Sequence, residues 1–139
     1  MKTARGQSAV EYASILVIVL LAMIPVAFIG LQYIENANRI SQAQAAVDAM
    51  VEAADLTFSQ GPGARTTVDV YFPSAVDPDR TSASGREIRI GVFLATGTQH
   101  DVFGLAKGNV TGTIPATPGF HRLRFEMLSS GIVQVTEPS

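Results

Sequence analysis

Apolar side chains dominate one long stretch near the N-terminus. Residues 12–34 carry no charge over 23 positions, and most are aliphatic, methionine or phenylalanine. As a helix, this stretch would be roughly 35 Å long, enough to cross the hydrocarbon core of a bilayer with some tilt. A cleaved secretory signal has a shorter apolar region of about 7–15 residues. The pattern therefore predicts a membrane-spanning helix that is retained, and removal as an ordinary signal is the less favoured alternative.

The next stretch, residues 36–60, is amphipathic. Its apolar residues recur at steps of three and four, which is typical of a helix with one apolar stripe. The stripe consists of Ile40, Ala43, Val47, Met50, Val51, Ala54 and Phe58. Gly61-Pro62-Gly63 then predicts the end of the helix. Because heptads are not sustained, we expect the stripe to pack on the protein's own sheet rather than in a coiled coil.

From Thr66 onward, apolar and polar residues alternate with a period of two. This alternation predicts strands with one buried face. The strands cover residues 66–72, 87–94, 122–127 and 133–135, with a weaker one at 101–107 that residues 110–114 can extend. Residues 73–85 and 115–119 are predicted as a polar loop and a turn, and residues 129–131 as the turn of a hairpin. The expected fold class is α+β: a long helix followed by a meander of four to five antiparallel strands, residues 66–139.

Composition narrows the class of protein. The 139 residues are 47% hydrophobic but only 16% charged, against about 25% charged in soluble domains. The net charge of −2 gives no basic excess for binding nucleic acid, so none is expected as a partner. The absence of cysteine excludes disulfides and thiolate metal sites.

Charged residues flank the apolar stretch asymmetrically. Lys2 and Arg5 precede it and Glu35 follows it, which predicts a cytoplasmic N-terminus and an outer location for the rest. Glu11, at the inner edge, would cost on the order of 2–3 kcal/mol within hydrocarbon, so it either has a partner or extends to the headgroups. Pro25 lies within the stretch, where it predicts a kink.

The first twelve residues resemble a known signal. Residues 2–6, KTARG, and residues 7–12, QSAVEY, are similar to the class III signal peptide of archaeal type IV pilin-like proteins. The resemblance implies a leader at residues 1–6, cut by a prepilin peptidase between Gly6 and Gln7. It also implies that a filament-core helix (residues 7–35), an amphipathic helix (36–60) and an extracellular β-rich head (66–139) remain together in a type IV pilin-like fold.

The resemblance also implies a function. It predicts a structural subunit of a surface filament used for adhesion, held in the bilayer before assembly. Its partners would be copies of itself or other pilins, with an assembly ATPase and a membrane platform protein. Glu11 would pair with the Gln7 amine of a neighbour and set the subunit register. The alternatives are a minor pilin or pseudopilin, or an anchored surface module that binds an unknown ligand. A leader of the bacterial tight-adherence type is similar.

No pattern for catalysis or cofactor binding is present. The sequence has no nucleophile elbow, phosphate loop or dinucleotide fingerprint, so we expect neither an enzyme nor a cofactor. Asp77-Pro78-Asp79 is better explained as a solvated turn than as a calcium site, and His100 and His121 as isolated histidines. The arginines of the strands are expected on a mixed solvated face, at positions 86, 89, 122 and 124. Asn109-Val110-Thr111 is a potential N-glycosylation site near a predicted turn.

Overall fold

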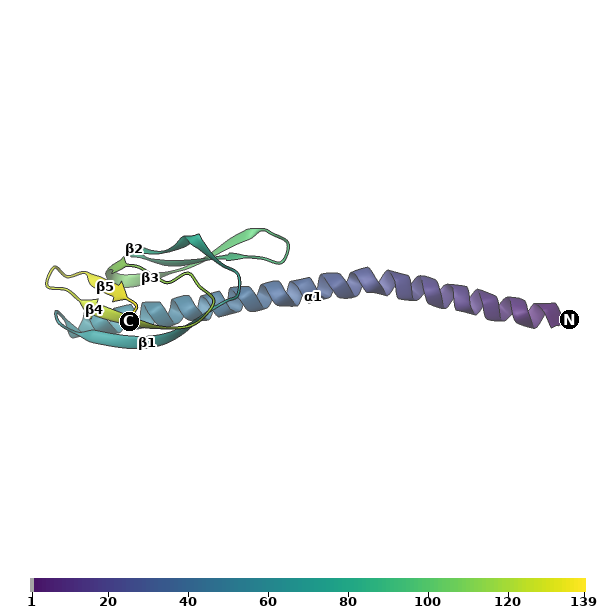
Figure 1. Cartoon of the computed structure of the whole chain (residues 1–139), viewed down its shortest axis with the longest axis horizontal. Helices are drawn as coiled ribbons and strands as arrows, with labels where there is room; N and C mark the ends of the chain where they lie inside the picture. Colours follow the sequence, from purple (N-terminus) through teal and green to yellow (C-terminus); the bar gives the residue numbers. More distant parts are fainter. Residues whose placement is uncertain (1) are drawn as a thin grey trace. The chain divides into compact units, whose positions relative to one another are not determined.

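The computed structural model describes residues 2–139, with side chains described from Gly6 onward. These residues form a helix, α1 (Lys2–Gln60), and five strands (Figure 1). The strands are β1 (Arg65–Phe72), β2 (Val76–Phe93), β3 (Gln99–Gly112), β4 (Gly119–Met127) and β5 (Val133–Thr136). The chain divides into two compact units, with the boundary between Ile34 and Glu35.

Helix α1 is continuous in secondary structure. It passes through Pro25 and joins the apolar stretch to the amphipathic stretch, as the sequence predicted. The predicted stop after Gln60 is also confirmed. Gly61 and Gly63 both have positive φ angles, 88° and 86°, which glycine adopts without a steric penalty. The Gly61 N–H donates to the Phe58 carbonyl, and this bond closes the last turn.

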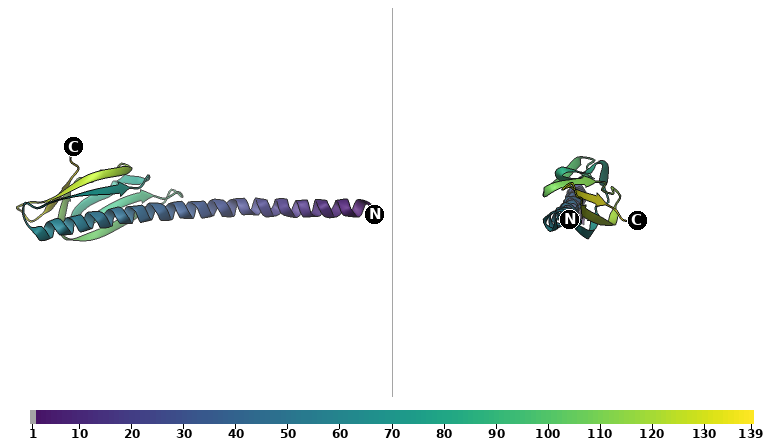
Figure 2. Two further views of the ribbon diagram at one scale, coloured as in Figure 1. Left: turned by 90° about the horizontal axis from the view of Figure 1, so that it is seen from below. Right: turned by 90° about the vertical axis from the view of Figure 1, so that its left-hand side faces the viewer.

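The second unit contains a five-stranded sheet packed on the amphipathic part of α1. The strand order is β1-β4-β5-β3-β2. All neighbouring pairs are antiparallel except β3 and β5, which are parallel. In Figure 1, β1 lies on one side of the C-terminal part of α1 and the β2–β3 pair on the other. Seen end-on in Figure 2, the strands curve around this part of the helix. The α+β class with a long helix on a mostly antiparallel sheet is therefore confirmed.

The expected meander is wrong. A meander would place β4 beside β3, but β5 lies between them and bonds to both. Residues 110–112 of β3 pair with residues 133–135 of β5. Gly112 makes this approach possible, because a Cβ atom there would lie 2.1 Å from the Val135 carbonyl oxygen. The short β5 thus fills a gap that the periodicity alone did not reveal.

The predicted polar loop at residues 73–85 is also wrong over most of its length. The strand β2 begins at Val76, and its residues 83–85 pair with residues 110–112 of β3. This part of the strand has polar side chains, and several of them, such as Asp77, Arg80 and Thr81, form hydrogen bonds in place of core packing. The Thr81 hydroxyl donates to the Asp77 carbonyl at 2.8 Å, for example.

The core lies between α1 and the sheet. Its largest fully buried side chains are Phe72, Phe125, Met50, Ile88, Ile90 and Leu123. The helix contributes the predicted stripe: Ala43, Val47, Met50 and Ala54 are buried. Phe58, the last member, is 37% exposed and lies against Gly108 of β3, where a Cβ atom would be 2.3 Å from the ring. The expectation that the stripe packs on the protein's own sheet is confirmed.

Candidate functional site

The most unusual feature of the first unit is its exposed apolar surface. We call residues 7–34 the apolar segment. Every large apolar side chain from Val10 to Ile34 is between 48% and 76% exposed. Soluble monomers rarely present contiguous apolar patches above a few hundred Å². By length and composition the helix can cross a membrane, and its most apolar window has no part buried in the structure.

Two tyrosines flank the apolar segment. Tyr12 and Tyr33 are each 76% exposed. They are about 31 Å apart along an α-helix, which matches the roughly 30 Å thickness of a hydrocarbon core. Tyrosine is enriched at both interfaces of a bilayer, where its ring and hydroxyl meet apolar and wet surroundings. The sequence prediction did not include these residues, and their spacing is the signal that identifies them.

The residues predicted for processing and register lie on the first turns of α1. Gly6, Gln7 and Glu11 are helical and exposed. Gln7 and Glu11 are four residues apart and share one helix face. The other helix positions three or four residues from Glu11 are Ser8, Ser14 and Ile15, and none of them carries a charge to pair with the carboxylate. Of the predicted leader, Met1 and the side chains of residues 2–5 lie outside the described part.

Pro25 lies at the middle of the apolar segment. The helix continues on both sides of it. Proline has no N–H, so the carbonyl oxygen of Leu21, four residues earlier, has no helical donor. A kink at Pro25 stays a prediction.

Asn109 lies within β3, which differs from the predicted position near a turn. Its side chain is exposed, and so is that of Thr111. The pairing of β2 with β3 shifts from Gly85↔Val110 to Glu87↔Leu105, so residues 106–109 form a bulge opposite Arg86 alone. The potential glycosylation triplet therefore begins at the end of a bulge.

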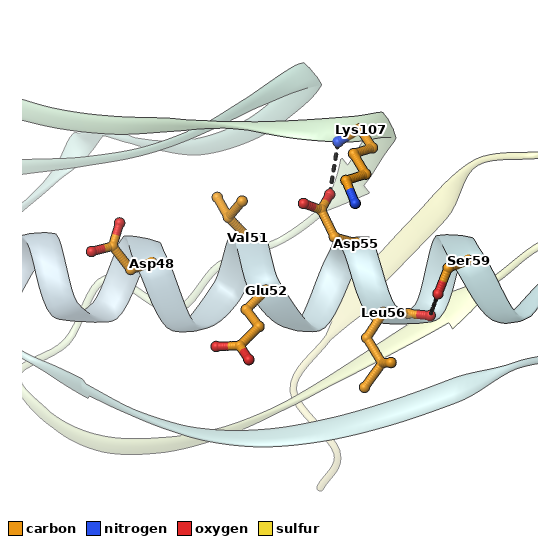
Figure 3. Close-up of a pocket in the computed structure, with 7 residues that line it drawn as sticks. All are labelled: Asp48, Val51, Glu52, Asp55, Leu56, Ser59 and Lys107. Carbon is orange, nitrogen blue, oxygen red and sulfur yellow. Dashed lines mark hydrogen bonds between the residues drawn. The ribbon is translucent and has the colours of Figure 1, made fainter.

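The bulge is fixed to the helix beside a shallow groove (Figure 3). The groove has a volume of about 500 Å³ and is lined by Asp48, Val51, Glu52, Asp55, Leu56, Ser59 and Lys107. The backbone N–H of Lys107 donates to Asp55 Oδ1 at 2.7 Å, as drawn in Figure 3. An acceptor for a bulge N–H is needed because the sheet supplies none there. Asp55 therefore has a structural task in this groove.

The predicted arginine face is divided. Arg86 and Arg89 are on β2 and Arg122 and Arg124 are on β4, and two strands separate β2 from β4 in the sheet. Arg89 pairs with Glu87 and Asp101. The four arginines therefore do not form one cluster in the described sheet, and the ion pairs of Arg89 and Arg122 with carboxylates agree with the expected mixed solvated face.

Arg122 and Asp69 form a two-point ion pair across β4 and β1. Arg122 Nε and Nη2 donate to the two carboxylate oxygens at 2.8 and 3.2 Å. The hydrogen bond from Arg122, together with its charge, lowers the pKa of Asp69 and outweighs the opposing effect of desolvation. In turn, the hydrogen bond and charge of Asp69 raise the pKa of Arg122. Both side chains are exposed, at 67% and 58%, so the pair is a surface feature.

The remaining candidates are held within the fold. Asp77 is only 3% exposed and accepts hydrogen bonds from the Asp79 N–H and the Gln99 amide, so the expected solvated turn is wrong at Asp77. His121 lies between the Thr117 carbonyl, 2.8 Å from Nε2, and Glu137, 2.7 Å from Nδ1. No group of three or more potential metal ligands among His, Cys, Asp and Glu occurs in the described part of the chain.

Comparisons of the chain with protein-family models, curated proteins and solved structures returned no match. The architecture is nevertheless compatible with the pilin-like resemblance of the first residues, because an apolar N-terminal helix leads into a helix-on-sheet unit.

Proposed function

We propose that the protein is a structural subunit of a type IV pilus-like surface filament that serves adhesion. The observation that carries the proposal is the apolar segment, which is exposed along its whole length yet joined to a unit with a complete core. Such a segment needs an apolar environment, which lipid provides before assembly and neighbouring helices provide in a filament. The pilin-like leader, Gln7 and Glu11 support the same assignment.

In this proposal the chain first spans the membrane once. Lys2 and Arg5 favour a cytoplasmic N-terminus, and Glu35 begins the outer part. A prepilin peptidase removes residues 1–6. An assembly ATPase and a membrane platform protein then move the subunit from lipid into the filament, where the heads face the outside. Asn109, with its exposed side chain, is the candidate acceptor for a glycan.

Glu11 sets the register in this proposal. Its carboxylate pairs with the new Gln7 amine of a neighbouring subunit, which makes two charges tolerable in apolar surroundings. Removal of Glu11 leaves that amine unpaired, and an unpaired charge within an apolar span costs about 2.5–3.5 kcal/mol of free energy. Because about 1.4 kcal/mol is tenfold in an equilibrium, we expect Glu11→Ala to lower the filament fraction by at least about tenfold.

The test compares Glu11→Ala with Glu35→Ala in the native host. Both variants remove one carboxylate from α1, at opposite ends of the apolar segment. The protein is measured in sheared surface filaments and in the membrane fraction, and its N-terminus is determined in both. We expect both variants to be cleaved and Glu35→Ala to assemble. Normal assembly of Glu11→Ala would contradict the register role. Wild-type protein found only in the membrane would favour the anchored surface module.

A further inference from the structure

The β2–β3 hairpin has a tight, uncharged end. We call residues 93–98, FLATGT, the hairpin tip. The Leu94 N–H donates to the Thr98 carbonyl at 2.8 Å, and the Gly97 N–H donates to the Leu94 carbonyl at 2.9 Å. Gly97 has a φ of 81°, which permits the turn. Thr96, Gly97 and Thr98 are exposed, and the Phe93 side chain is 38% exposed. The tip therefore presents small polar groups beside one aromatic ring.

Two side chains of α1 hold the hairpin tip. Asn36 Oδ1 accepts a hydrogen bond from the Ala95 N–H at 2.6 Å. Arg39 donates from Nη1 to the Phe93 carbonyl at 2.9 Å, and its Nη2 pairs with Glu35. The guanidinium is thereby shared between the tip and a carboxylate on its own helix. Both bonds fix the tip to the start of the second unit, residues 35–39.

The start of the second unit follows the apolar segment directly. Ile34 is the last residue of the segment, and Asn36 comes two residues later, which is about 3 Å of helix rise. The headgroup layer on each side of a bilayer is about 5–7 Å thick. If the stretch from Tyr12 to Tyr33 fills the hydrocarbon core, Asn36 lies about 4–5 Å beyond it, within the headgroup layer. Tyr33, one residue before Ile34, is the residue type expected at that boundary.

We propose that the hairpin tip rests on the outer headgroup layer of the bilayer while the subunit is in the membrane. This inference depends on the membrane location given under the proposed function. The tip carries no charged side chain, and its exposed threonine hydroxyls can hydrogen-bond to headgroups. The partly exposed Phe93 ring, next to these groups in the tip, supplies apolar contact.

Contact with lipid gives the tip a task before assembly. A contact made by the tip, and fixed through Asn36 and Arg39, would hold the outer unit in one orientation toward the membrane surface. The contact is lost when the subunit leaves the bilayer. Extraction of the subunit from the bilayer therefore requires breaking the tip contact as well as removing the apolar segment from lipid.

The chain offers a clean labelling experiment, because it contains no cysteine. Three single-cysteine full-length chains, Thr96→Cys, Ser130→Cys and Ile24→Cys, are spin-labelled in vesicles of phosphatidylcholine and phosphatidylglycerol. Collision rates with oxygen, which concentrates in lipid, and with a water-soluble nickel chelate report the depth of each label. Ser130 is the matched control, since it is an exposed residue of the turn between β4 and β5. That turn adjoins Met127, which bonds to Ala64 beyond the far end of α1, about 36 Å of helix from Asn36.

We expect the Thr96 label to have an interfacial ratio of oxygen to nickel collisions, between the Ile24 value and the Ser130 value. Thr98→Cys gives the same measurement if a label at Thr96 disturbs the turn. A Thr96 label as accessible to nickel as Ser130, with Ile24 in hydrocarbon, would overturn the tip contact and leave the membrane location intact. A Thr96 label shielded from both reagents would indicate a second copy on the tip and would also overturn the proposal. An Ile24 label accessible to nickel would instead overturn the membrane location itself.

Discussion

Residues 7–34 and residues 36–60 belong to one helix, but their side chains meet different surroundings. In the first stretch every large apolar side chain is at least 48% exposed, whereas in the second Ala43, Val47, Met50 and Ala54 are buried under the sheet. The backbone hydrogen bonds are of the same kind in both. The difference is in the pattern: apolar residues surround the first stretch and form a single stripe on the second.

The comparison separates two sources of stability. The second stretch gains stability from burial within its own unit. The first stretch gains none inside the described structure, so its free energy depends on what surrounds it, whether lipid or other helices. The same change of side chain should therefore have unequal effects in the two regions.

The largest difference in stability is expected between two phenylalanine truncations, one in each region. Phe125 is 0% exposed and Phe28 is 61% exposed. Phe125→Ala should lower the free energy of unfolding by about 3–5 kcal/mol, because it leaves a cavity in the core. Phe28→Ala should leave the unfolding of the second unit unchanged. Urea unfolding of the full chain in detergent micelles measures both, and similar losses would break the comparison.

Two glycine-to-alanine substitutions should have opposite effects on stability. Gly112 has a φ of 132° and faces the Val135 backbone, so Gly112→Ala should destabilise the sheet by about 1–3 kcal/mol or more. Gly30 lies within α1, and a Cβ atom added there would meet nothing within 4 Å, so Gly30→Ala should favour the helix by about 0.5–1 kcal/mol. Urea unfolding tests the first and helix content by circular dichroism tests the second. A tolerated alanine at Gly112 would contradict the close approach of β5.

A smaller effect is expected at the bulge. Asp55→Ala removes the acceptor of the Lys107 N–H and should cost about 1 kcal/mol of stability. Asp55→Asn keeps an oxygen at the same place and should cost less. Hydrogen exchange of the Lys107 amide provides the direct measurement, with faster exchange expected in the alanine variant only. Equal exchange in the wild type and Asp55→Ala would show that the bulge is held by other contacts, such as the Phe58 ring.

The smallest effect is expected at the surface pair. Because Arg122 lowers the pKa of Asp69 in the folded protein, the pair stabilises the fold above the ordinary carboxyl pKa. That contribution should be lost as pH falls through the lowered value. Exposure keeps the effect small. NMR titration of the Asp69 carboxyl, with Arg122→Gln as the comparison, should show a lower midpoint in the wild type. Equal midpoints would mean that the pair does not persist in solution.

The periodicity of the sequence predicted each strand at least in part. Alternation located residues 66–72 and 122–127, which begin one residue after the start of β1 and three after the start of β4 and end where the strands end, because each strand buries one face. It missed the first half of β2, where partners such as Asp77 and Thr81 are polar. It could not predict the strand order, since the position of β5 depends on the contact between Gly112 and Val135, far apart in sequence.

The candidate site was predicted less evenly. Residues 1–12 carry the leader pattern, so Gly6, Gln7 and Glu11 could be named from sequence, although their roles depend on processing and on neighbouring subunits. Tyr12 and Tyr33 can be identified as interface residues only when their spacing along the helix is compared with the thickness of a bilayer. The bonds from Asn36 and Arg39 to the hairpin tip join residues more than fifty positions apart and have no local signature.

The most direct test of the account is the N-terminal residue and intact mass of the protein purified from its native host. The account predicts a chain that begins at Gln7 and retains the apolar segment. A chain that begins at Met1 would contradict pilin-type processing and leave an anchored surface protein. A chain that begins after Ile34 would contradict the central claim, because the apolar segment would then be a discarded signal.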